Sequence, residues 1–150
     1  MEAPRTSQRT HSALYVYMLN SHERLRDLLA RVFEAMAFNA RDDVAALWGV
    51  FDHGLLAHME AEERFVLPVF AHVDREEAQA LLRDHGLLRQ ELLQLGVAID
   101  LHCARYPRAG EFAALLERHA RREEALLYRW ADERLSGETI EHVKQHAAAP

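Results

Sequence analysis

Residues 44–69 read VAALWGVFDHGLLAHMEAEERFVLPV, and this stretch decides the fold. Steps of three and four residues select side chains that share one face of a helix. Selected in this way, the stretch presents a stripe of Val44, Trp48, Phe51, Leu55, His58, Glu62, Phe65 and Val69. The stripe is apolar except at His58 and Glu62. It therefore predicts a long amphipathic helix with one polar pair on the face that packs against its neighbours.

Three other segments repeat this spacing, and each also carries polar residues in an apolar stripe. They run over residues 15–36, 78–102 and 112–130. Turn-forming residues separate the four segments at residues 39–43, 71–74 and 103–107. Four long helices with short connections predict an all-α fold, namely an up-down-up-down four-helix bundle.

Local signals support the helix starts. Asp74, followed by Glu77 three residues later, predicts a capping box, and Pro107 suits the first turn of a helix. A short fifth helix is expected at the C-terminal end, after Ser136 and Gly137. We expect a single domain over residues 1–150, with its core over about 11–135.

Composition excludes several classes of protein. The net charge of −6 argues against a nucleic-acid partner, which would favour a basic face. Cys103 is the single cysteine, which excludes a disulfide framework and a cysteine-based zinc site. The longest apolar stretch near the start, residues 13–19, is too short to span a membrane and lacks a cleavage pattern. We therefore expect a cytoplasmic protein without a membrane or nucleic-acid partner.

Six polar residues occupy stripe positions that should face the bundle centre. They are His22, His58, Glu62, His85, His119 and Glu123. Two residues of an antiparallel helix pair lie level when the turn falls midway between them. The sequence midpoint between the polar positions of successive segments falls inside the first break and inside the second break. For the last pair of segments it falls at Cys103, the edge of the third break. All six can therefore meet in one layer, where a bound metal cluster would satisfy groups that are costly to bury alone.

The chain also repeats itself in two halves. His22 precedes His58 by 36 residues and His85 precedes His119 by 34. Each half ends in a His-x-x-x-Glu pair, whose members share one helix face. Imidazole and carboxylate ligands without a thiolate suit iron, manganese or zinc, and two carboxylates are enough to bridge a pair of metals. None of the ten histidines follows a Glu at the Glu-x-x-His spacing of ferritin-like di-iron bundles.

These motifs resemble the hemerythrin-like, or HHE cation-binding, family. The resemblance covers about residues 11–135. It rests on four motifs, namely His22-Glu-Arg-Leu, Leu56-Ala-His58-Met-Glu-Ala-Glu62-Glu63-Arg-Phe-Val-Leu-Pro68, Asp84-His85 and His119-Ala-Arg-Arg-Glu123-Glu124-Ala-Leu-Leu-Tyr128. It implies a four-helix bundle with a non-heme centre of two iron ions, manganese or zinc being the alternatives. The four histidines, His22, His58, His85 and His119, would be terminal ligands. Glu62 and Glu123 would bridge, with Glu124 as the alternative to Glu123.

One departure from the family bears on function. Oxygen-carrying hemerythrins have a fifth histidine one helical turn from the position of His85, where this chain has Leu81 and Arg89. One more coordination position would stay open, which favours redox chemistry over reversible oxygen storage. We therefore expect a di-iron protein that binds or reduces oxygen, peroxide or nitric oxide, with an activity of oxidase or peroxidase type. The alternative is an iron sensor or reservoir whose bundle stability is set by the metal.

The surroundings of the six residues can also be predicted. We expect Glu63, Glu124 and Arg89 to face water. The apolar wall of the site should comprise Met18, Leu25, Leu55, Leu88 and Leu116.

Overall fold

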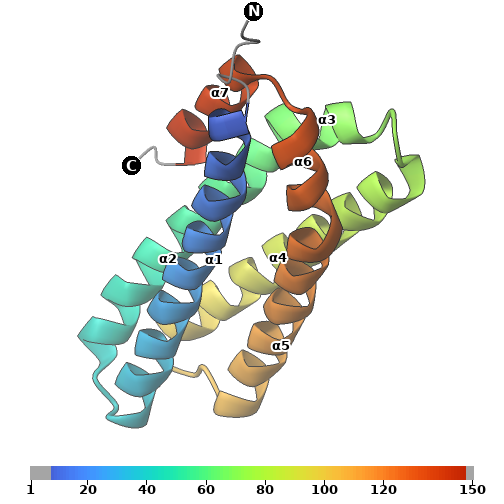
Figure 1. The fold of residues 1–150 in the computed structure, drawn as a ribbon. Coiled ribbons are helices and arrows are strands. Elements are labelled where there is room, and N and C mark those ends of the chain that lie inside the picture. Colours follow the sequence, from blue (N-terminus) through green and yellow to red (C-terminus); the bar gives the residue numbers. More distant parts are fainter. Residues whose placement is uncertain (1–7, 148–150) are drawn as a thin grey trace, which may run out of the picture.

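The computed structural model describes residues 8–147, and Figure 1 shows their arrangement. The elements are α1 (Gln8–Ala37), α2 (Arg41–Ala61), η1 (Glu62–Val66), α3 (Leu67–Phe70), α4 (Arg75–Asp100), α5 (Tyr106–Arg122), η2 (Glu123–Leu127), α6 (Tyr128–Arg134) and α7 (Gly137–Ala147). Residues 1–7 and 148–150 of the expected domain, and the side chain of His11, lie outside the described part. Within residues 8–147 there is no strand. None of the helices described could cross a membrane.

The predicted four-helix bundle is confirmed. α1 and α4 are two of its helices, and the other two are the continuous runs α2-η1-α3 and α5-η2-α6 (Figure 1). The expected fifth helix is α7, which packs against α1, α2 and η1 at one end of the bundle.

The connections follow local chemistry. The side chain of Asp74 accepts a hydrogen bond from the backbone N–H of Glu77 at 3.0 Å, which caps α4. The reciprocal half of the capping box is replaced, because the Glu77 carboxylate binds Arg122 instead. Asn39 and His102 have φ angles of 54° and 55°, the left-handed conformation that ends a helix. His102 therefore lies in a turn, and not on the helical stripe that its spacing suggested.

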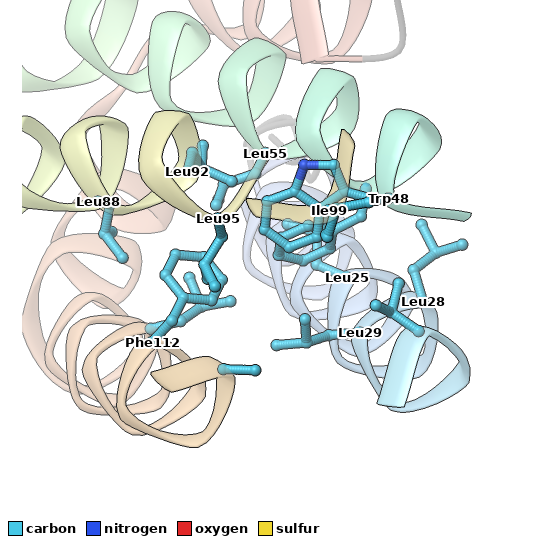
Figure 2. Packing of buried hydrophobic residues seen from close by; sticks show 14 of the residues in the cluster. Leu25, Leu28, Leu29, Trp48, Leu55, Leu88, Leu92, Leu95, Ile99 and Phe112 are labelled. Atoms are coloured by element: carbon cyan, nitrogen blue, oxygen red, sulfur yellow. The ribbon is translucent and has the colours of Figure 1, made fainter. Parts of the chain in front are cut away.

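Two apolar cores fill the bundle, one at each side of a polar layer. The first core joins α1, α2, α4 and α5, and its side chains converge between the four helices (Figure 2). Within it the rings of Trp48, Phe51 and Phe112 contact one another at centroid distances of 5.4–6.0 Å. The second core includes Met18, Leu81 and residues from α3, α6 and α7. On every long helix the polar stripe residues lie between the two cores.

The inward stripe of two helices shifts by one position where the backbone forms a π-helical turn. The N–H of Leu67 bonds to the carbonyl of Glu62 in η1, five residues back, where an α-helix would use four. Downstream of Glu62 the buried residues are therefore Val66, Leu67 and Phe70, whereas Phe65 is only half-buried and Val69 is 45% exposed. The predicted inward positions Phe65 and Val69 were wrong because the spacing rule assumes an uninterrupted α-helix.

The second half has the same shift. The N–H of Tyr128 bonds to the carbonyl of Glu123, and η2 turns Leu127 and Tyr128 into the core. Leu126, predicted to face inward, is 44% exposed, and Trp130 is half-buried. Each π-helical turn begins at a stripe glutamate, and such turns are frequent at functional sites.

Candidate metal centre

The structure brings all six stripe residues together in the polar layer. α1 supplies His22, α2 supplies His58, α4 supplies His85 and α5 supplies His119, while Glu62 and Glu123 open η1 and η2. All six are buried, with exposed fractions between 0 and 5%. Helix periodicity and the position of the turns therefore placed them correctly, because an error of two residues along a helix moves a side chain by only about 3 Å.

The six residues form two groups of four that share both carboxylates. Half-site one comprises His22, His58, Glu62 and Glu123, and half-site two comprises His85, His119, Glu62 and Glu123. In each group, one ligand-type atom from every residue lies within 4.8 Å of the others. Four nitrogen or oxygen atoms at such distances can surround one cation.

Glu62 reaches both half-sites with different oxygens. Its Oε1 lies 3.1 Å from Nε2 of His58, and its Oε2 lies 3.3 Å from Nε2 of His85. Glu123 also faces both, because its Oε1 lies 3.0 Å from Nε2 of His119 and 3.5 Å from Nε2 of His22. This is the arrangement expected of bridging carboxylates.

Among residues 8–147, five buried polar atoms of the cluster make no hydrogen bond of acceptable geometry, although two pairs of them lie 3.0 and 3.3 Å apart. They are Glu62 Oε2, His85 Nε2, His119 Nε2 and both carboxylate oxygens of Glu123. Buried polar groups are normally paired, and five unpaired ones in a single layer need an explanation. All five are atoms of the kind that bind metals, so the residues present fit a pair of metal ions.

Each histidine is held from behind through Nδ1, which leaves Nε2 facing the centre. The four partners are Glu124 for His22, Ser21 for His58, Glu63 for His85 and Asp84 for His119, at 2.8–3.2 Å. Such contacts orient the imidazole of a metal ligand and fix the tautomer that leaves Nε2 free.

The contacts of the two halves follow one pattern. Glu124 binds both His22 and Arg26, which is four residues further along α1. Glu63 likewise binds His85 and Arg89, again four residues apart, with Arg89 nitrogens 2.7 and 3.0 Å from the two carboxylate oxygens. The expectation that Glu63, Glu124 and Arg89 simply face water was wrong. They lie at the outer end of hydrogen-bond networks that connect the surface to the buried His22 and His85.

The position of Glu124 also bears on its role. Its carboxylate is 19% exposed and contacts His22 from the Nδ1 side, whereas Glu123 is fully buried among the Nε2 atoms. The geometry therefore favours Glu123 as the bridging residue.

Burial and the attraction between imidazoles and carboxylates shift the pKa values of the cluster residues. Burial opposes protonation of His22 and His85, but the adjacent carboxylates outweigh it and raise their pKa values to about 9 and about 10. The pKa of His119 is raised for the same reason, against the effect of burial. Burial alone would raise the pKa of Glu62, yet the neighbouring imidazoles hold it well below its usual value. Cations replace such protons when they bind.

Tyr128 ends the last sequence motif, but sequence reasoning gave it no role in the site. Its ring is buried, and its hydroxyl lies 2.8 Å from Nε2 of His22, 3.0 Å from Nε2 of His58 and 2.5 Å from Oε1 of Glu62. Burial and the nearby carboxylates raise the pKa of Tyr128. Tyr128 lies five residues after Glu123. It is on the inward face because η2 adds one residue to the helical turn. A π-helical turn has no clear local sequence signal.

A small apolar pocket opens beside the cluster, between α1, α2 and α5. Its volume is about 20 Å³. It is lined by Leu25, Leu55, Met59, Leu116, Ala120, His22, His58, His119, Glu123 and, at its edge, Arg26 and Glu117. Three of the five predicted wall residues line it. The other two, Met18 and Leu88, are buried in the adjoining cores.

The remaining histidines with described side chains lie away from the cluster. His53, His72, His102 and His142 are exposed. His146 pairs with Glu60 at 3.2 Å on the surface.

The fold and the cluster define a class of protein, a helical bundle with a buried histidine–carboxylate centre for metal. Comparison with known families is more specific, because the hemerythrin HHE cation binding domain matches residues 13–131. The chain therefore belongs to the hemerythrin HHE cation-binding family. No curated protein and no solved structure matches it significantly.

Proposed function

We propose that this protein holds two iron ions and binds or reduces a small ligand, namely oxygen, peroxide or nitric oxide. The observation that carries the proposal is the pair of four-residue groups that share Glu62 and Glu123. His22 and His58 would hold one ion, His85 and His119 the other, and both glutamates would bridge.

The chemistry of the donor set favours iron. The ligands are imidazole nitrogens and carboxylate oxygens, a mixture that suits iron, with manganese or zinc as alternatives. The single cysteine, Cys103, is exposed in the connection between α4 and α5 and is not part of the cluster. A thiolate-binding metal such as copper(I) is therefore disfavoured.

The pocket supports a small ligand. At about 20 Å³ it has room for about one water-sized molecule. Leu25, Leu55 and Leu116 give it apolar walls, which disfavour water and charged molecules. His119 and Glu123 connect it to the cluster. An organic substrate would not fit unless the helices moved apart.

The chain's own residues prepare the centre. The Nδ1 contacts hold the four rings and direct Nε2 inward, and the two apolar cores exclude water on both sides. When bound, two ferrous ions supply two electrons and open coordination positions for the small ligand.

The first test is the metal itself. Native protein produced with adequate iron should contain about two iron atoms per chain, one for each four-residue group. Its ferric form should absorb in the near ultraviolet, where zinc is silent. Protein without a bound transition metal would refute the proposal.

The second test separates the candidate functions. Anaerobically reduced protein, mixed with oxygenated buffer in a stopped-flow instrument, should be oxidised to the ferric form without reversal when the oxygen pressure falls. Reversible oxygen binding would indicate a carrier. Metal-loaded protein that reacts with none of the three ligands, yet unfolds when chelated, would indicate the sensor or reservoir.

The missing fifth histidine provides a matched pair of variants. Leu81 is buried one turn before His85, whereas its neighbour Leu82 is 45% exposed. Leu81→His should supply an imidazole and slow the oxidation by oxygen, and Leu82→His should not change it. Equal rates in both variants would contradict the argument from an open position.

The proposal also includes a single domain in the cytoplasm that acts without nucleic acid or membrane. The free Cys103 agrees with a reducing compartment, and the net charge of −6 disfavours a nucleic-acid partner.

A further inference from the structure

The hydroxyl of Tyr128 lies among the atoms that face half-site one. Its distances to His22 Nε2, His58 Nε2 and Glu62 Oε1 are 2.8, 3.0 and 2.5 Å. Those three atoms come from three different residues of half-site one. No other residue outside the six has a described contact with so many of their inward-facing atoms.

In the metal-free protein a proton between these atoms can hold this position, and a cation can take the place of that proton. A phenol carries one proton and can donate one hydrogen bond, and Glu62 is the acceptor that suits it. His22 and His58 have partners at Nδ1, Glu124 and Ser21, so their Nε2 lone pairs point to the same place as the phenol oxygen. Two nitrogen lone pairs directed at a phenol oxygen repel it unless a proton or a cation lies between them.

The spacing of the four atoms fits a shared cation. Neighbouring ligand atoms on an octahedral ion lie about 3 Å apart when each metal–ligand bond is about 2.1 Å. The two Nε2 atoms are 3.1 Å apart, and His58 Nε2 is 3.1 Å from Glu62 Oε1. Together with the three Tyr128 distances, five of the six separations among these four atoms lie between 2.5 and 3.1 Å.

The residue equivalent to Tyr128 in the other half of the chain is Leu67, which cannot bind a cation. Tyr128 directly follows η2, and Leu67 directly follows η1, each five residues after a bridging glutamate. Leu67 is buried but has no oxygen or nitrogen in its side chain. The phenol therefore makes the two otherwise similar half-sites chemically different.

We propose that the Tyr128 oxygen is a fifth protein ligand of the iron in half-site one, bound as a phenolate. The inference rests on the proposed iron centre. On binding, the O–H bond is replaced by an O–Fe bond and the proton passes to solvent. Half-site one then has five protein ligands and half-site two has four.

The test is spectroscopic and does not depend on turnover. Wild-type protein, Tyr128→Phe and Tyr17→Phe are loaded with ferrous iron and oxidised in air. Tyr17 is the matched control, because its hydroxyl bonds to the carbonyl of Lys144, remote from the cluster. Wild type and Tyr17→Phe should show a phenolate-to-ferric charge-transfer band in the visible and tyrosinate modes in the resonance Raman spectrum. Tyr128→Phe should lose both while it retains both iron atoms.

The outcomes distinguish a failure of the Tyr128 inference from a failure of the proposed iron centre. Wild-type protein with two iron atoms and no tyrosinate modes overturns the inference and leaves the iron centre intact. Tyrosinate modes that persist in Tyr128→Phe overturn it as well. Wild-type protein without iron refutes the proposed function instead. If Tyr128→Phe fails to fold, wild type made with ring-deuterated tyrosine decides, because the modes must shift if a tyrosine is bound to iron.

Discussion

Metal-free protein should become less stable as the pH rises from 6.5 to 9. The cause lies in His22 and His85: burial opposes their protonation, but the carboxylates around them outweigh it and raise their pKa values from 6.5 to about 9 and about 10. A group with a raised folded-state pKa stabilises the fold fully below its unfolded pKa, and that stabilisation is lost as the pH passes the folded pKa. For His22 the shift corresponds to about 3 kcal/mol, a large share of a stability of about 5–15 kcal/mol.

Acid should destabilise the metal-free protein as well. The pKa of Glu62 is held well below 4.5, so its contribution is present above pH 4.5 and is lost as the pH falls through the lower folded value. Stability should therefore be greatest between about pH 4.5 and 6.5.

The metal-loaded protein should not share this loss of stability above pH 6.5. Iron must displace the protons on His22 and His85, and each displaced proton strengthens binding about tenfold per pH unit up to the pKa of its group. The stronger binding offsets the stability that the metal-free fold loses, so the protons of His22 and His85 should leave the stability of the loaded protein nearly constant over this range.

The assay is urea unfolding of chelated and iron-loaded protein, followed by far-ultraviolet circular dichroism at several pH values. His22→Gln should reduce the pH dependence of the chelated form without abolishing it, because His85 keeps its raised pKa. His142→Gln is the control, because His142 is exposed on α7 and contacts Phe65 rather than the cluster. Chelated wild type whose stability is constant or rises from pH 6.5 to 9 would refute the reasoning.

Other predictions follow from single contacts. Glu123→Ala should abolish binding of the metal pair. Glu124→Ala removes the contact behind His22 and should retain two metals, with about 10–100-fold weaker affinity in a chelator competition. Equal metal loss in both would show that Glu124 is itself a ligand. Phe112→Ala should lower the free energy of unfolding by about 3–5 kcal/mol, because the Phe112 ring packs on Trp48 and Phe51. Leu93 is 71% exposed, so Leu93→Ala should change the free energy of unfolding by less than about 0.5 kcal/mol. Asp74→Ala should cost about 1 kcal/mol in the same urea assay through loss of the α4 cap, and an unchanged midpoint would show that the cap is dispensable.

The sequence by itself determined the helices, the turns and the six polar residues of the central layer. These follow from properties that act over a few residues. A step of three or four positions defines a helix face, Asp74 caps α4 through a bond three residues away, and Pro107 occupies the first turn of α5. The level at which His22, His58 and His85 meet depends only on helix rise and turn position, so it too could be predicted.

Only the tertiary structure decided what surrounds that layer. The π-helical turns at Glu62 and Glu123 change the inward face after each glutamate, and they depend on packing among four helices rather than on a local signal. They explain why Phe65 and Leu126 were placed on the wrong face and why Tyr128 was missed. The contacts of Glu63 and Glu124 join residues that are 22 and 102 positions apart in the chain, a distance over which local periodicity carries no information.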